Sequence, residues 1–198
     1  VIEFYSFAET SPKLFRDALT AFEKTGYDKL VIDLRGNPGG YLEAAVDIAS
    51  WFLPAGEIIV TEDYGDKRSP IIHRSKGYNI FSDKLKLVIL TDKGSASASE
   101  ILTGALVYHK KATQIGSNTF GKGSVQELIE ITPETSLKVT VARWLMPDNN
   151  GISKDGIAPQ IEVEIPKEVI EKNSKLKKDE EKIDPAMDRA VQFLHTGK

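Results

Sequence analysis

An apolar run, a glycine-rich turn and a helix-like segment follow one another twice along the chain. Residues 30–34 (LVIDL) form a short, almost wholly apolar run that is typical of a buried strand, and the turn RGNPGG comes directly after them. Residues 42–53 then have the apolar spacing of a helix. The same order recurs in residues 85–90 (LKLVIL), the turn TDKGSASASE and a predicted helix over 100–108. Two such units predict an α/β domain with a partly parallel sheet.

Further elements surround these two units. Residues 137–144 alternate between apolar and polar side chains and are predicted to pair antiparallel with residues 124–131. A polar stretch over 63–83 predicts a hairpin or a surface loop. A helix is predicted to begin at Ser11, because a proline follows where the first helical turn favours one, and to end at Gly26. The remaining predicted strands cover residues 1–7, 58–62, 112–116 and 161–165.

The C-terminal part of the chain differs in character. Residues 166–183 are dense in charge and lack a sustained apolar face, so a charged linker or an exposed helix is expected. Residues 184–195 have the spacing of a short amphipathic helix that begins at an Asp-Pro pair. We therefore divide the chain into a core over 1–165, the charged segment over 166–183 and a short C-terminal helix over 184–198.

Composition excludes several classes of protein. The 198 residues are 40% hydrophobic and 28% charged with a formal net charge of −3, and no basic excess indicates a nucleic-acid partner. The chain has no cysteine, which excludes disulfides, thiolate metal sites and a cysteine nucleophile. No apolar run approaches the ~18–20 residues that a membrane-spanning helix needs, so no stable membrane insertion of this segment is expected. No targeting segment is recognisable either.

The two glycine-rich turns are candidate sites for chemistry. Ligands bind at the carboxyl ends of the strands of a parallel sheet, which is where residues 35–40 and 94–100 are expected. Glycine lets backbone N–H groups approach a ligand closely, and the first N–H groups of a helix are unpaired. Together the turns could form an oxyanion hole. Ordinary strand-to-helix connections remain the alternative interpretation.

The second turn contains three serines before the predicted helix. Ser97 and Glu100 fit the capping box S-x-x-E, in which the serine only caps the helix. A serine at such a place is also exposed with amides beside it, as a nucleophile must be. The residues alone do not choose among Ser95, Ser97 and Ser99 as a nucleophile.

A serine nucleophile needs a base. His73, His109 and His195 all lie outside the glycine-rich turns, so nothing favours a Ser-His-Asp arrangement, although it stays open. Lysine is the other base known to serve serine, and Lys122 lies between two glycines in TFGKG. A lysine acts as a base only when burial lowers its pKa from the free value of ~10.4. If the segment is extended, Gln126 lies on the same face as Lys122 and can orient its amine.

One competing motif overlaps the lysine segment. Residues 116–122 (GSNTFGK) match most of a phosphate-binding P-loop, G-x-x-x-x-G-K. That motif needs serine or threonine next, where Gly123 stands, and a helix afterwards, where SVQELIEI favours a strand. A nucleotide-binding protein is therefore a disfavoured alternative.

Three motifs taken together, LVIDLRGNPGG, GSASASEILTGAL and TFGKGSVQ, resemble those of the carboxyl-terminal processing proteases, the tail-specific family of serine peptidases. The resemblance runs over about residues 1–165, and GISKDGIAPQIEV is similar to a later strand segment of that family. It implies an α/β fold similar to the crotonase/Clp-peptidase type, with a mixed sheet, short β-hairpins and a C-terminal helix. It implies no metal or organic cofactor.

The resemblance also assigns roles to individual residues. The family has a serine and a lysine 25 residues apart, with a glutamine four residues after the lysine, and this chain matches that spacing. By resemblance, Ser97 is the nucleophile, Lys122 is its base and Gln126 positions the lysine. The implied reaction is hydrolysis of peptide bonds in unstructured or C-terminal segments of a protein substrate.

The oxyanion hole that the resemblance implies would use the backbone N–H of Ala98 and that of Gly39 or Gly40. The family acts outside the bacterial cytoplasm or in the chloroplast lumen, so an extracytoplasmic location is expected. Its members usually carry a PDZ domain before this core, and none is present in these residues. The sequence does not specify an oligomeric state.

A non-catalytic peptide-binding or scaffold domain of the same fold is the alternative from another class of protein. Such a domain can keep the glycine-rich turns after losing its activity. Because Ser97, Lys122 and Gln126 are all present at the matching spacing, the catalytic interpretation is preferred.

Overall fold

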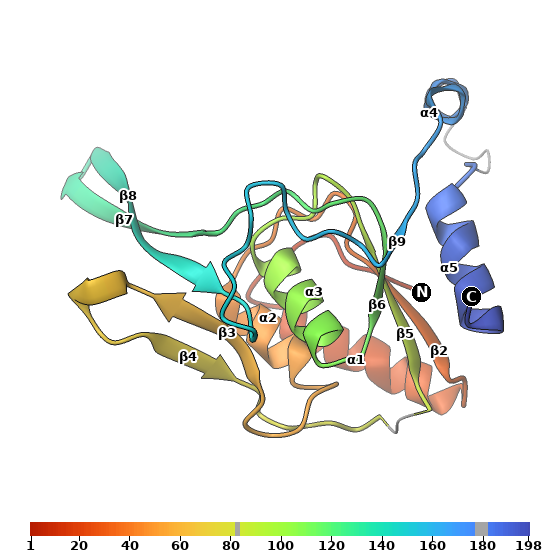
Figure 1. Ribbon diagram of the computed structural model, residues 1–198, viewed down its shortest axis with the longest axis horizontal. Coiled ribbons are helices and arrows are strands. Elements are labelled where there is room, and N and C mark those ends of the chain that lie inside the picture. Colours follow the sequence, from red (N-terminus) through yellow and green to blue (C-terminus); the bar gives the residue numbers. More distant parts are fainter. Residues whose placement is uncertain (82–83, 177–181) are drawn as a thin grey trace.

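The parallel strands form one sheet. The computed structural model describes residues 1–81, 84–176 and 182–198, and within them the order of this sheet is β1-β2-β5-β6-β9 (Figure 1). Each neighbouring pair is parallel, so the turns that follow β2, β5 and β6 leave from the same edge of the sheet. The strands are β1 (Ile2–Glu3), β2 (Lys29–Asp33), β5 (Lys86–Thr91), β6 (Thr113–Gly116) and β9 (Ile161–Glu162).

A second sheet is antiparallel and consists of two hairpins in the order β4-β3-β8-β7. Its strands are β3 (Ile58–Asp63), β4 (Ile71–Arg74), β7 (Ser124–Thr132) and β8 (Thr135–Leu145), with a short 3-10 turn, η1 (Gly65–Lys67), inside the first hairpin. The β7–β8 hairpin extends away from the rest of the molecule (Figure 1). The predicted antiparallel pairing of residues 124–131 with residues 137–144 is confirmed.

The helices of the described residues are α1 (Ser11–Lys24), α2 (Leu42–Ala49), α3 (Ala98–Tyr108), α4 (Lys167–Ser174) and α5 (Pro185–Thr196). In α1, a proline occupies the first turn, and Phe15 and Leu19 of the predicted apolar stripe are buried. The helix predicted over 42–53 ends earlier, at Ala49. The hydroxyl of Ser50 donates to a carbonyl of the helix and accepts a backbone N–H from a distant loop, and the chain turns there.

Alternate side chains of the parallel strands point to opposite faces of the sheet, as the strand geometry requires. Leu30 and Ile32 of β2 belong to the large apolar core that includes side chains of α1, α2 and α3. Val31, with Val88 and Leu90 of β5, belongs to a second core on the other face. The α5 side chains in that second core are Ala186, Ala190 and Leu194. The sheet is therefore covered on both faces, with α5 on the opposite side from α1–α3 (Figure 1), and the expected α/β fold with hairpins and a C-terminal helix is confirmed.

The charged segment over 166–183 contains α4, in which no side chain is buried. Residues 177–181 of this segment lie outside the described residues. The division of the chain at 165 and 183 therefore stays a prediction. No helix of the described residues is long and apolar enough to cross a bilayer.

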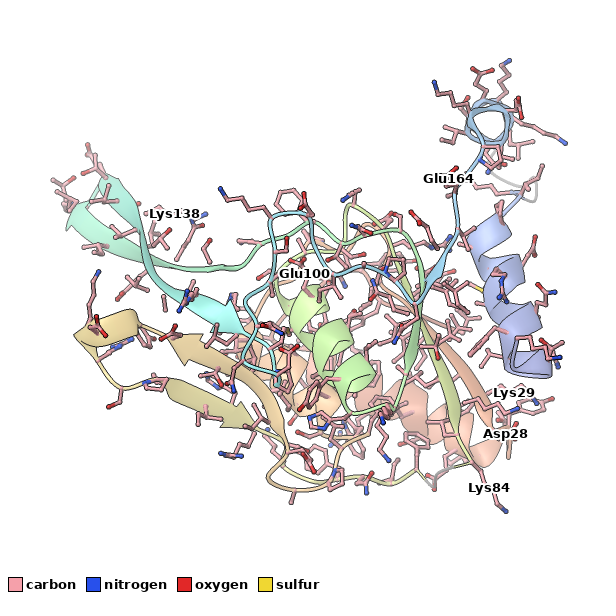
Figure 2. All side chains as sticks on the ribbon, in the orientation of Figure 1. Asp28, Lys29, Lys84, Glu100, Lys138 and Glu164 are labelled. Carbon is pink, nitrogen blue, oxygen red and sulfur yellow. The ribbon has the colours of Figure 1, made fainter. Side chains whose placement is uncertain are left out.

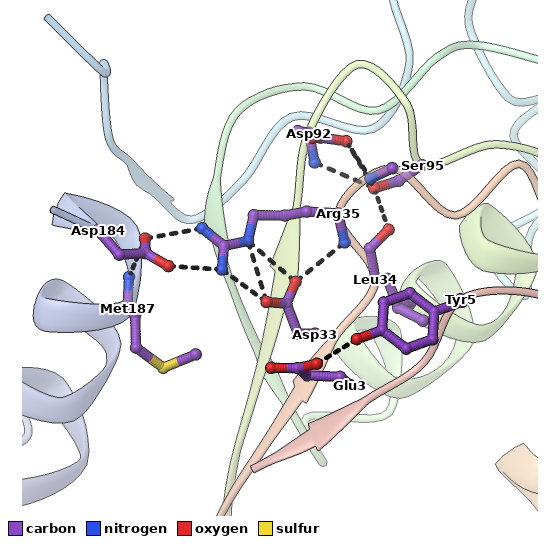
Figure 3. A network of polar contacts seen from close by, with 10 residues as sticks. Glu3, Tyr5, Asp33, Leu34, Arg35, Asp92, Ser95, Asp184 and Met187 are labelled. Carbon is purple, nitrogen blue, oxygen red and sulfur yellow. Dashed lines mark hydrogen bonds and ion pairs between the residues drawn. The ribbon is translucent and has the colours of Figure 1, made fainter. Parts of the chain in front are cut away.

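Arg35 ties α5 to the end of β2 (Figure 3). Its guanidinium donates to both carboxylate oxygens of Asp33 and, at 2.7 Å each, to both carboxylate oxygens of Asp184. Asp184 also caps α5 by accepting the N–H of Met187 at 3.0 Å. Burial raises the pKa of Asp184, but the hydrogen bonds from Arg35 and Met187 outweigh burial and hold that pKa below its usual range. Because Arg35 begins the first glycine-rich turn, the same ion pair fixes where that turn starts.

Asp184→Asn removes the negative charge that pairs with Arg35 but keeps a side chain that can cap α5. The free energy of unfolding should therefore fall by about 1–2 kcal/mol at neutral pH. The pKa of Asp184 is lower in the folded state, so its stabilising effect is present above the unfolded-state value of ~3.9 and is lost as the pH falls through the folded-state value. Urea denaturation at several pH values should therefore show the difference between wild type and variant shrinking in acid.

Asp188→Asn is the control, because Asp188 lies in the first turn of the same helix and is exposed. An equal loss of stability in both variants would contradict a stabilising effect of the Arg35–Asp184 ion pair.

Candidate active site

The two glycine-rich turns touch at the carboxyl edge of the parallel sheet. A β-carbon on Gly39, whose φ is +95°, would lie 2.5 Å from the carbonyl oxygen of Ala96 and 2.9 Å from the amide nitrogen of Ala98. Only glycine permits this approach. The carbonyl oxygen of Asn37 accepts the N–H of Ala96 and the hydroxyl of Ser99, each at 3.0 Å. The turn after β2 is therefore bonded directly to the start of α3.

Ser97 is the N-cap residue of α3 and has a strained backbone. Its φ of 56° and ψ of −114° lie where residues with a side chain are rare, and such strain is frequent at functional sites. The Ser97 side chain is half-buried, whereas Ser95 and Ser99 are buried and donate their hydroxyls to main-chain carbonyl groups. The hydroxyls of these two neighbours therefore hold the turn together, which leaves Ser97 as the serine of this turn that is available for chemistry.

Glu100 lies in the first turn of α3 (Figure 2). Its hydrogen bonds join the serine turn to the lysine segment. Its side chain is fully buried, and both carboxylate oxygens accept hydrogen bonds. Oε1 accepts from the hydroxyl of Thr119 at 2.6 Å and from the N–H of Gly121 at 2.8 Å. Oε2 accepts from the N–H of Ser97 and from the N–H of Lys122, each at 2.9 Å. Since both of these amide nitrogens are bonded to one oxygen, they lie no more than twice that distance apart.

Lys122 is half-buried in the segment between β6 and β7. Gly121 and Gly123 on either side of it press their backbones against the main chain of residues 152–154, where a β-carbon would collide. The Lys122 Nζ has no hydrogen bond or ion pair among the residues that the structure describes. The backbone of Lys122 is thus held from two sides while its amine is left uncommitted.

Gln126 is an exposed residue of β7 and pairs with Thr140 of β8. A bulge between Val125 and Gln126 interrupts the regular alternation of the strand, and Lys122 precedes the strand. The even spacing from Lys122 is therefore not by itself a sign of a shared face here. No hydrogen bond joins the two side chains in the described part of the chain.

The amides of Gly39 and Gly40 differ in their availability. The Gly39 N–H donates to the side-chain oxygen of Asn37 at 2.9 Å. Gly40 forms an isolated parallel bridge with Phe7. The two hydrogen bonds of this bridge are made by the residues before and after Gly40, so the Gly40 N–H itself points away from Phe7. Within the described ranges, neither this N–H nor that of Ala98 has a hydrogen-bond partner.

The three histidines are engaged elsewhere or exposed. His73 of β4 contacts the carboxylate of Glu62 at 2.7 Å. His109 follows the C-terminus of α3, and Ser97 precedes its N-terminus, so the length of this helix separates them by about 18 Å at 1.5 Å per residue. His195 is an exposed residue in the last turn of α5. Glu100, by contrast, was predicted only as a helix cap, because its partners in the lysine segment lie about twenty residues away and left no signal in the sequence.

Two other chemistries receive no support from the geometry. A P-loop requires a helix after its lysine, and here the strand β7 follows, so residues 116–122 do not form a P-loop. In the described residues, no group of three or more His, Asp or Glu side chains is placed to hold a metal ion.

Comparison with known proteins gives the family. Residues 1–163 match the profile of peptidase family S41. The chain is 37% identical over 165 residues to the carboxy-terminal processing protease CtpA of Bacillus subtilis, which covers 83% of this chain and 35% of that protein. It is 41% identical over 159 residues to a probable CtpA-like serine protease of Staphylococcus aureus, covering 80% of this chain and 32% of that protein. The chain thus spans about a third of the length of these relatives.

Solved structures agree. A photosystem II D1 C-terminal processing protease is 32% identical, with a TM-score of 0.74 over 82% of this chain and 41% of that chain. A putative S41 protease from Bacteroides fragilis, at 17% identity, has the same fold, with a TM-score of 0.77 over 98% of this chain and 54% of that chain. The resemblance found in the three motifs is therefore confirmed, and the chain belongs to peptidase family S41.

Proposed function

We propose that this chain is the catalytic core of a serine endopeptidase in which Ser97 is the nucleophile and Lys122 is its base. The observation that carries the proposal is the pair of hydrogen bonds, 2.9 Å each, from the amides of Ser97 and Lys122 to one oxygen of Glu100. Membership of family S41 supports peptide hydrolysis as the reaction. The uncommitted amine of Lys122 and the strained, half-buried Ser97 are what a nucleophile and its base require.

In the first step, the neutral amine of Lys122 takes the proton of the Ser97 hydroxyl while the Ser97 oxygen attacks the carbonyl carbon of the substrate. The tetrahedral intermediate then expels the amine, which receives the proton from Lys122, and an ester of Ser97 remains. A water molecule, deprotonated by Lys122, hydrolyses this ester and restores the serine.

The negative oxygen of the intermediate needs hydrogen-bond donors, each typically worth ~3–4 kcal/mol of the barrier. We assign this role to the N–H groups of Ala98 and Gly40, because the Gly39 N–H is already bonded to Asn37. Gly39 contributes by lacking a β-carbon, which lets its turn approach Ala98. The Ala98 amide lies in the first turn of α3, where the helix dipole also favours a negative charge.

The substrate is an unstructured or C-terminal segment of a protein, in line with the names of the carboxy-terminal processing proteases that this chain resembles. The same resemblance supports action outside the cytoplasm. A non-catalytic peptide-binding domain of this fold is the second candidate, and it predicts binding without cleavage.

Ser97→Ala and Lys122→Ala should each lower kcat for cleavage of an unfolded protein by about 10³-fold or more, because nucleophile and base act as a unit. Cleavage is followed by gel electrophoresis and by release of new amino termini. Lys138→Ala is the matched control, since Lys138 is an exposed lysine on the β7–β8 hairpin (Figure 2). Cleavage that survives Lys122→Ala would exclude the Ser-Lys mechanism, and binding of the unfolded chain without any cleavage would favour the scaffold.

Gln126→Ala should lower kcat by about tenfold with an unchanged melting temperature, because Gln126 is exposed and we assign it to orienting the Lys122 amine. The comparison is with Glu127→Ala, the next exposed position of β7. Equal activity of the two variants would remove Gln126 from the mechanism.

A further inference from the structure

The carboxylate of Glu100 is buried at the point where the serine turn and the lysine segment meet. It is fully buried, yet no lysine or arginine pairs with it in the described residues. Its partners are three backbone N–H groups and one hydroxyl, from Ser97, Thr119, Gly121 and Lys122. We infer that Glu100 is a positioning residue that sets the placement of nucleophile and base together, an inference that rests on the function proposed above.

The hydrogen-bond pattern indicates which form of the side chain the site is built for. An ionised carboxylate has acceptor positions only, and three of the groups around Glu100 are main-chain N–H groups that can only donate. A charge this deeply buried is tolerated only when its lone pairs are satisfied. The four donors together satisfy both oxygens of the Glu100 carboxylate.

The shared oxygen couples the two segments geometrically. Because Oε2 accepts from both Ser97 and Lys122, a shift of the lysine segment breaks a bond of the same oxygen that holds the serine amide. Ser97 has a strained φ of 56°, which persists only when surrounding contacts over-determine it. Glu100 supplies one of those contacts.

Thr119 extends this coupling to the next layer of the structure. Its hydroxyl donates to Oε1 of Glu100 at 2.6 Å and accepts the N–H of Ile157 at 2.7 Å. Gly156, beside it, lies so close to Thr119 that a β-carbon would collide with the Thr119 backbone. Glu100 therefore holds the lysine segment from inside, and residues 152–157 hold it from outside.

A helix cap alone would affect stability and leave the chemistry intact in the folded enzyme. A positioning role makes a different prediction, since Glu100 is fully buried and contacts the backbones of Ser97 and Lys122. Losing it should lower kcat and leave KM little changed, because the site that binds the peptide is intact while the reacting atoms are displaced.

The test compares wild type, Glu100→Gln and Thr103→Val. Gln has the same shape, but its NH₂ group faces two donors and cannot accept from them. Thr103 is buried in the same helix, and its hydroxyl has no hydrogen-bond partner, so its replacement controls for a buried change in α3 that leaves the two segments untouched. A fluorophosphonate probe, in which the Ser97 oxygen displaces fluoride from phosphorus, reports the reactivity of the serine without a peptide substrate. Kinetics on an unfolded protein and melting curves complete the comparison.

We expect Glu100→Gln to be labelled by the probe about 100-fold more slowly than wild type and to lose kcat by a similar factor, while Thr103→Val keeps wild-type rates. If Glu100→Gln is folded at the assay temperature and reacts at the wild-type rate, the inference is overturned, and the proposed function stands. If wild type itself is neither labelled nor active, the proposed function fails, and the inference fails with it.

A second pair of variants decides the question if Glu100→Gln does not fold. Thr119→Ser keeps the hydroxyl that donates to Glu100, whereas Thr119→Val removes it and keeps the shape. Slow probe labelling in the valine variant with recovery in the serine variant supports the positioning role. Equal labelling of the two variants contradicts it.

Discussion

The close backbone contact between the two strand-to-helix turns is the constraint on which the site depends. The turn after β2 and the turn after β5 come from neighbouring parallel strands, and the missing side chain of Gly39 lets them meet main chain to main chain. A single added methyl group there would push Ala98 and its N–H out of place. Sheet topology brings the turns to one edge, and one glycine decides how near they come.

The sequence predicted most strands and helices of the molecule well, because local patterns of apolar and polar residues encode them. The continuous apolar runs of β2 and β5 predicted buried strands, and the packing of Leu30 and Val31 into cores on opposite faces of the sheet agrees with that prediction. The end of α2 was missed, because the Ser50 hydroxyl at its end accepts a hydrogen bond from the backbone N–H of Lys76, in a loop far along the chain. Such a contact leaves no trace in a local pattern.

The candidate site was predicted only in part for the same reason. The spacing of Ser97 and Lys122 could be matched to a family, but local chemistry could not choose Ser97 over Ser95 and Ser99. The structure separates these serines by burial and by hydrogen bonds to main-chain carbonyl groups. The second role of Glu100 was also invisible, because its partners other than Ser97 lie about twenty residues along the chain and are mostly main-chain groups, which have no sequence signature.

The order of the strands in the parallel sheet has a consequence for how the chain folds. The three segments of the site leave β2, β5 and β6, which are adjacent in the sheet but widely separated along the chain. Pairing such strands costs conformational entropy, because long loops must close before the contacts between the strands form. We therefore expect this pairing late in folding. A partly folded chain that contains α3 but has not yet docked β2 lacks the Gly39–Gly40 turn beside Ser97, which is the turn from which we propose the second oxyanion donor. The geometry of the proposed site therefore arises only when the parallel sheet closes.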